Sequence, residues 1–272
     1  MPQKQLSIIT INYNNNAGLK STMESVLSQT STDFEYIIID GGSKDGSSDT
    51  IKELLKSDKQ KKIKFWCSER DKGIYNAMNK GVQHANSKYC LFLNSGDVLI
   101  SNTTIETALS ELKNKQEDII AGTEVFTNGT IITPISPEKL NAFVYMDGFL
   151  PHESTFINTK VIKSIKYREN YTIASDFIFF FEAIFMNNCT YSTIPTHITL
   201  FNLDGISSTS NNIGHAEIAD FYNKNVPNYV MQLYNKYRIL CDNKYIEYGY
   251  KTANNKMLLF IYKVFRKLGF LK

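Results

Sequence analysis

The chain has 272 residues, of which 42% are hydrophobic and 21% are charged, and its formal net charge is +3. This is the composition of an ordinary globular protein, and the small positive charge gives no reason to expect a nucleic-acid partner. No run reaches the ~20 apolar residues of a membrane-spanning helix, and the N-terminus lacks the apolar core of a secretory signal, so we expect a cytoplasmic protein.

The first hundred residues alternate between strand-like and helical runs. Apolar, β-branched runs predict four strands, and apolar residues at helical spacing predict three helices between them. The strands are expected at 6–12, 34–40, 62–68 and 88–94, and the helices at 18–30, 48–57 and 73–85. Strands that alternate with helices indicate parallel pairing through right-handed crossovers, so the sequence predicts an α/β fold with a mostly parallel sheet.

Polar side chains follow each of the four predicted strands. Because ligands of parallel sheets bind beyond the carboxyl ends of the strands, these positions are the candidate site. Each stretch alone could be only a turn, but four together fit a nucleotide cleft. None has the spacing of a dinucleotide-binding loop or a P-loop. The stretches are Asn12-Tyr13-Asn14, Asp40-Gly41-Gly42-Ser43, Ser68-Glu69-Arg70-Asp71 and Asn94-Ser95-Gly96-Asp97.

Four segments occur in a characteristic order and spacing: "SIITINYNN", "FEYIIIDGGSKDGS", "DKGIYNAMNKG" and "YCLFLNSGD". In this pattern the chain resembles family 2 glycosyltransferases of the GT-A fold, of the bacterial type that builds O-antigens, capsules and exopolysaccharides. The resemblance continues more weakly through "LPHESTFIN", "IASDFIFFFEA" and "LDGISS". It implies a catalytic domain over 1–208, with a nucleotide-binding half at 1–99 and an acceptor half at 100–208, and a helical extension over 209–272.

The resemblance implies an inverting transfer of a hexosyl or N-acetylhexosaminyl group. The donor would be a nucleotide sugar, usually a UDP-sugar, and the acceptor a hydroxyl of a lipid-linked or growing polysaccharide. Asp40 matches the acid that accepts the N–H of uracil, which suits an ionised carboxylate. Asn79 could equally be a solvated helix position. The matched nucleotide-sugar positions are Thr10, Asn12, Tyr13, Asp40, Asp71, Asn79, Asn94 and Ser95.

Asp97 occupies the last place of the turn that carries the metal-binding acids in that family. Gly96 and Asn94 stand where further acids are often found. Mn²⁺ and Mg²⁺ take oxygen ligands, and one carboxylate together with a donor diphosphate suffices for either ion. We therefore expect Asp97 to bind a divalent metal.

Asp176 matches the family's general base, which removes the proton of the acceptor hydroxyl. It stands at the start of a strongly apolar predicted helix, where an N-cap role is also possible. We favour Asp176 over Glu182, which lies further along the same run. His152 and Glu153 match positions near the donor sugar or acceptor, although a single histidine is often structural.

The C-terminal part is predicted to be helical, with a break at Pro227. Its last residues, 256–272, form a basic amphipathic pattern, which fits either a membrane surface or packing on the core. The lipid-linked acceptor favours peripheral attachment to the cytoplasmic membrane. Two alternative functions stay open: a nucleotidyltransferase, and a catalytically decayed sugar-nucleotide-binding module of the same fold.

Overall fold

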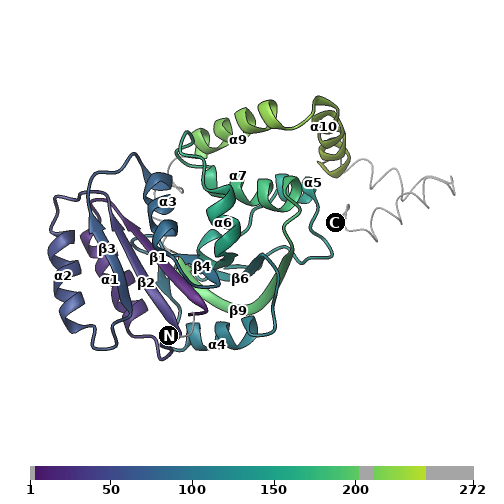
Figure 1. The fold of residues 1–272 in the computed structure, drawn as a ribbon. Coiled ribbons are helices and arrows are strands. Elements are labelled where there is room, and N and C mark those ends of the chain that lie inside the picture. The colour runs from purple at the N-terminus through teal and green to yellow at the C-terminus, as the bar shows by residue number, and fades with distance from the viewer. Residues whose placement is uncertain (1–3, 202–210, 243–272) are drawn as a thin grey trace, which may run out of the picture.

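A computed structural model of the protein describes residues 4–201 and 211–242 (Figure 1). Its centre is a nine-stranded mixed sheet in the order β3-β2-β1-β4-β8-β6-β9-β5, with β7 paired to β6. The strands are β1 Leu6–Asn12, β2 Phe34–Asp40, β3 Ile63–Ser68, β4 Tyr89–Phe92, β5 Val98–Leu99, β6 Ile119–Phe126, β7 Ile131–Ile132, β8 Thr155–Asn158 and β9 Tyr191–Phe201.

The predicted α/β fold is confirmed, and the four strands of the first half pair in parallel as expected. The register brings three polar strand ends level, because Asn12 pairs with Asp40 and Asp40 pairs with Ser68. The second half differs from a purely parallel sheet. Strand β8 runs antiparallel to both β4 and β6, while β9 returns parallel to β6.

Helices cover both faces of the sheet (Figure 1). Strand β1 alternates, with Leu6 and Ile8 packed toward α1, α2 and α4, and Ile9 and Ile11 packed toward α3, α6 and α7. The helices are α1 Asn16–Leu27, α2 Ser47–Ser57, α3 Ile74–His84, α4 Thr104–Leu112, α5 Ala142–Met146, α6 Thr159–Ile165, α7 Ser175–Phe181, α9 Asn211–Asn225 and α10 Asn228–Asp242, with a 3-10 turn at His152–Ser154 and a π-helical turn at Glu182–Met186.

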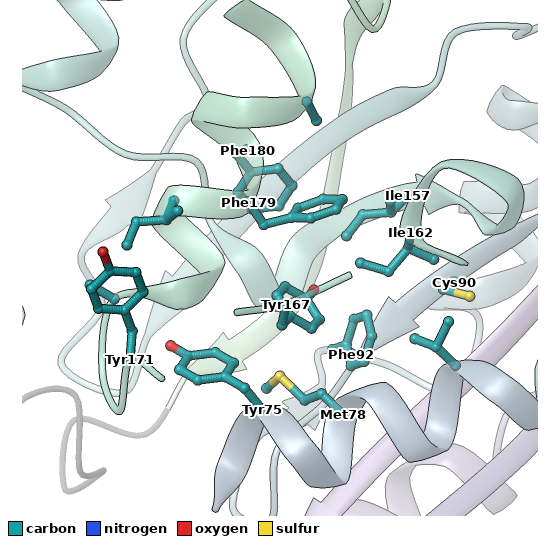
Figure 2. Packing of buried hydrophobic residues seen from close by; sticks show 14 of the residues in the cluster. Tyr75, Met78, Cys90, Phe92, Ile157, Ile162, Tyr167, Tyr171, Phe179 and Phe180 are labelled. Carbon is teal, nitrogen blue, oxygen red and sulfur yellow. The ribbon is translucent and has the colours of Figure 1, made fainter. Parts of the chain in front are cut away.

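An aromatic cluster joins the two halves of the sheet beside α3 (Figure 2). The ring of Tyr167 lies 5.6 Å from that of Tyr75, 5.4 Å from that of Phe92 and 5.2 Å from that of Phe179. These rings come from α3, β4, α7 and the segment before it. The cluster therefore fixes α7 relative to the strand that leads into the Asp97 turn.

The C-terminal helices break at Pro227, as the sequence predicts. Helix α9 buries Phe221 in the same hydrophobic cluster as α7, so this part of the predicted extension packs on the α/β core. The predicted boundary at residue 208 and the basic tail at 256–272 lie outside the described residues, and they stay predictions. Within the described ranges, no helix is long and apolar enough to cross a membrane.

Candidate active site

The four predicted strand ends meet in one hydrogen-bond network. The Nδ2 of Asn12 donates to Oδ1 of Asp40 over 2.7 Å, and the hydroxyl of Ser68 donates to Oδ2 of the same carboxylate. On its other side, Oδ1 of Asn12 accepts from the hydroxyl of Ser95 over 2.8 Å. The loops after β1, β2, β3 and β4 are therefore locked together, as the parallel topology requires.

Asp40 is fully buried at the centre of this network. Its two oxygens accept four bonds, from the amide of Asn12, the hydroxyls of Ser43 and Ser68, and the backbone N–H of Ser43. Protein donors thus occupy the acceptor capacity that a carboxylate has. A uracil N–H could bond Asp40 only by replacing one of these donors, so the uracil contact stays a prediction.

Tyr13 and Asp71 both lie against Gly41, next to Asp40. A Cβ at Gly41 would stand 2.5 Å from Oδ2 of Asp71 and 3.1 Å from the ring of Tyr13. A side chain at this position would therefore displace the Asp71 carboxylate and crowd the Tyr13 ring. The Tyr13 side chain is 67% exposed, so its ring is accessible to a flat ligand such as a nucleobase.

Two other predicted contact residues point into the protein. The buried hydroxyl of Thr10 accepts from Tyr36 over 2.9 Å inside the sheet. Asn79 donates to the backbone oxygen of Tyr167 and to Glu169, and accepts from the backbone N–H of Tyr167. Its side chain is buried, so the solvated position considered for it is wrong. We leave both residues out of the proposed site.

The turn after β4 is built around Gly96 and presents Asp97. Gly96 has a φ of +115°, a conformation that side-chain-bearing residues rarely adopt, which explains why no acid stands there. The turn is tied to α1, because the hydroxyl of Thr22 donates to the Asp97 carbonyl over 2.7 Å. Oδ2 of Asp97 accepts from the backbone N–H of Asn94 over 3.1 Å, so the carboxylate is held in place.

Oxygen atoms gather around Asp97. The Nδ2 of Asn94 donates to Oε1 of Glu153 over 3.3 Å, while the Oδ1 of Asn94 is buried and has no partner among the described residues. The carboxylate of Glu124, from β6, lies close enough to feel the charges of both Glu153 and Asp97. The oxygens of Asp97, Asn94 and Glu153 are of the kind that Mn²⁺ or Mg²⁺ binds. The described residues contain no group of three acid, histidine or cysteine side chains that could hold a metal by itself, so an ion would need the donor's phosphates as further ligands.

Asp176 is the second residue of α7, and Ala174 occupies the N-cap position. The N-cap role considered for Asp176 is therefore wrong. Burial raises the pKa of its carboxyl group above the ordinary value, the facing His152 opposes this, and Glu153 reinforces it. The phenol of Tyr75 lies 2.8 Å from Oδ1 of Asp176 and also 2.7 Å from the backbone oxygen of Ile173. A carboxylate with a raised pKa is a stronger base than an exposed aspartate.

Glu182, the rejected alternative, has both oxygens engaged by Arg168 in a bidentate ion pair. His152 is buried, with Nε2 2.8 Å from the Tyr167 hydroxyl and its ring stacked on Phe92. Its Nδ1 stands 3.9 Å from Oε1 of Glu153. Burial lowers the pKa of His152, but the neighbouring Glu153 and Asp176 outweigh this and raise it above its usual value. His152 therefore has a structural position from which it faces the carboxylate cluster.

Two further groups were not found from the sequence. Glu124 is an acid inside the otherwise apolar run "IIAGTEVF", a pattern that marks a functional position on a buried strand. Glu217 of α9 accepts from the backbone N–H groups of Thr172, Ile173 and Ala174, just before α7. Nothing in the sequence around Glu217 signals this contact across 44 residues.

The family model of glycosyl transferase family 2 matches residues 7–186. The uncharacterized glycosyltransferase Rv1514c of Mycobacterium tuberculosis is 30% identical over 214 residues, which are 75% of this chain and 77% of that protein. The UDP-Glc:alpha-D-GlcNAc-diphosphoundecaprenol beta-1,3-glucosyltransferase WfgD of Escherichia coli is 28% identical over 136 residues, which are 50% of this chain and 52% of WfgD.

Among solved structures, TarS of S. aureus in complex with UDP-GlcNAc superposes with a TM-score of 0.61 at 18% identity, over 76% of this chain and 61% of that chain. This likeness concerns the fold, and it confirms the expected GT-A architecture. The family model covers more than half of the sequence and the Mycobacterium relative matches three quarters of it. This chain therefore belongs to glycosyltransferase family 2.

Proposed function

We propose that the protein transfers a hexosyl or N-acetylhexosaminyl group from a UDP-sugar to an acceptor hydroxyl, with inversion at the anomeric carbon and with Asp176 as general base. The observation that carries this proposal is the position of Asp176. Its half-buried carboxylate, with a raised pKa, faces the same cluster as Glu153 and lies on a helix packed against the strand that leads to Asp97.

In the proposed reaction, Oδ of Asp176 accepts the proton of the acceptor hydroxyl as that oxygen attacks the anomeric carbon. The bond between the anomeric carbon and the β-phosphate oxygen breaks on the opposite face, and UDP leaves with the electron pair. Tyr75 keeps the carboxylate oriented through its hydroxyl. A positioned base of this kind accelerates such a step by about 10²–10⁴-fold.

Asp97 would hold a divalent cation together with the donor's diphosphate. Such a cation neutralises the negative charge that develops on the leaving phosphate. The buried Oδ1 of Asn94, which has no partner in the described structure, and Glu153 supply further oxygens nearby.

The nucleotide would lie over the network after β1 to β4. Tyr13 offers an exposed ring for the nucleobase, and both Tyr13 and Asp71 lie against Gly41. Ser95 and Asn12 link this base site to the Asp97 turn. This arrangement supports one continuous site for the nucleobase, the ribose and the diphosphate. The buried carboxylate of Asp40 holds the loops of this site together through its hydrogen bonds.

The acceptor is proposed to be a lipid-linked sugar in surface-glycan synthesis. The relative WfgD, by its name, uses a sugar on diphosphoundecaprenol. The basic pattern at 256–272 would attach this chain to the membrane that carries such a lipid. Deleting 256–272 is expected to release the protein from anionic liposomes while activity on a soluble acceptor survives. Liposome binding that is unchanged by the deletion would refute the attachment.

The decisive experiment measures UDP release from UDP-glucose and UDP-N-acetylglucosamine, with Mn²⁺ and with a chelator. Turnover of either sugar nucleotide, lost in Asp176→Asn, supports the proposal. A nucleotidyltransferase would instead release pyrophosphate from UTP and a sugar 1-phosphate. A decayed module would bind UDP without any turnover.

A further inference from the structure

Glu124 is a buried acid on the central part of the sheet. It lies near the end of β6, paired in register with Thr199 of β9 and Ile132 of β7. Only 2% of its surface is exposed. Burying an ionisable side chain costs free energy unless the group is fully hydrogen-bonded or serves a ligand.

The Oε1 of Glu124 has no hydrogen-bond partner among the described residues. Glu35, another buried acid of the same sheet, shows the ordinary arrangement. Its Oε1 accepts from the hydroxyls of Ser7 and Ser87 and from the backbone N–H of Asn86. Glu35 is therefore explained by the fold, whereas Glu124 retains an unused acceptor in the interior.

Glu124 lies near Glu153 and Asp97 of the active site described above. Burial raises the pKa of its carboxyl group to about 9, and the nearby charges of Glu153 and Asp97 add to this. Its free Oε1 is therefore a buried hydrogen-bond acceptor beside the proposed donor site.

The chemistry favours a hydroxylated ligand over a metal ion for this group. The described residues hold no group of three metal-binding side chains here, so Glu124 does not belong to a ready-made cation site. A sugar hydroxyl, in contrast, can donate its proton to a single free carboxyl oxygen. Another buried oxygen without a partner among the described residues, Oδ1 of Asn94, belongs to a side chain that bonds Glu153 in the same cluster.

We propose that Glu124 binds a hydroxyl of the donor sugar through its free Oε1, and so contributes to the choice of sugar. This inference rests on the proposed function, since it assumes a sugar nucleotide in the site. It predicts a difference between two ligands. UDP lacks the sugar and should not depend on Glu124, whereas UDP-sugars should.

The test is calorimetric titration of the full chain, in Mn²⁺, with UDP, UDP-glucose and UDP-N-acetylglucosamine. The variants are Glu124→Gln and Glu124→Met, which keep the side-chain volume. Glu117→Gln, the same chemical change just before the start of β6, is the control. We expect the better-bound UDP-sugar to lose about 10- to 100-fold in affinity in Glu124→Met, the range for one buried hydrogen bond, whereas Glu124→Gln, whose amide still offers an oxygen acceptor, should lose less. UDP affinity should stay within about twofold, and the control should match wild type.

Equal losses for UDP and UDP-sugar, or no loss for either, would overturn the role of Glu124 while leaving the proposed function intact. If both variants unfold at a lower temperature than wild type, Glu124 stabilises the fold, and its proposed role in sugar binding is overturned as well. Wild-type protein that binds none of the three probes would refute the proposed function itself, and this inference with it.

Discussion

The phenol of Tyr75 lies 2.8 Å from Oδ1 of Asp176 and connects α3, in the first half of the sheet, to α7 in the second. The two residues are 101 positions apart in the sequence. The bond lowers the pKa of Asp176, while burial, the larger effect, raises it. The reactivity of the proposed base therefore depends on how the two halves pack.

Tyr75→Phe removes this hydrogen bond and keeps the ring in the aromatic cluster. Because the bond favours the ionised form of Asp176, its loss should raise the carboxyl pKa further. The acidic limb of the kcat/KM profile should then move to higher pH, with UDP affinity unchanged. A limb that does not move would show that Asp176 does not set it.

Asp176→Asn keeps the shape of the side chain and removes the proton acceptor. Transfer should fall by at least about 100-fold, the lower limit for a lost general base. Titration with UDP should give wild-type affinity, since the side chain that bonds the Asp176 carboxylate is Tyr75 of α3, outside the loops after β1 to β4. Near wild-type transfer would move the role to another carboxylate, with Glu153 the next to test.

Asp97→Asn should weaken UDP binding in Mn²⁺ and reduce turnover together. The backbone bond from Asn94 can still reach an amide oxygen, so the turn should fold normally. Asn94→Asp adds a carboxylate beside the same ion and should be tolerated or should tighten metal binding. Turnover by wild-type protein that is insensitive to a chelator would refute the metal role.

Gly41→Ala should weaken UDP binding by about tenfold or more, equivalent to ~1.4 kcal/mol. The added Cβ would stand 2.5 Å from Oδ2 of Asp71 and 3.1 Å from the Tyr13 ring, so the Asp71 carboxylate must move and the Tyr13 ring must give way slightly. Thermal unfolding serves as the control, because the loop lies at the edge of the sheet. Unchanged affinity for UDP would show that the uracil base binds elsewhere.

Glu217→Ala should destabilise the fold by about 1–3 kcal/mol, because it leaves backbone N–H groups before α7 without their acceptor. Burial opposes ionisation of Glu217, but the N–H groups of Thr172, Ile173 and Ala174 outweigh it and lower the pKa. The stabilisation is therefore present above the usual glutamate pKa and is lost as the pH falls through the lowered one. Urea unfolding of variant and wild type at pH 7 and at acid pH measures both the destabilisation and its pH dependence. An equal difference in unfolding free energy at the two pH values would contradict the pH dependence.

Glu124 should make the empty protein less stable as the pH rises. Its pKa is about 9 in the folded protein and 4.5 as the ordinary value, so the folded state holds a proton that the unfolded state has released. The free energy of unfolding of the wild-type protein should therefore fall as the pH rises between these two values. In Glu124→Gln, which cannot lose this proton, it should fall less. Melting temperatures of wild type and Glu124→Gln from pH 5 to 9 give the slope of stability against pH for each protein. Parallel slopes would contradict the raised pKa of Glu124.

The sequence alone determined the elements of the first hundred residues. Apolar, β-branched runs and helical spacing are local properties, so β1, β2, β3 and the helices between them could be predicted closely. Because parallel strands end at one edge, the meeting of Asn12, Asp40 and the Asp97 turn also followed from the order of elements. The family resemblance singled out Asp97 and Asp176.

Only the tertiary structure decided which of these side chains are available to a ligand. Asp40 and Asn79 have the residue types of binding groups, yet their hydrogen bonds are used by the protein itself. Glu124 comes near the site through the pairing of β6 with β9, and Glu217 contacts the segment before α7 through the packing of α9 near α7. Such contacts join positions far apart along the chain, and local propensity carries no information about them, because they depend on how whole elements pack.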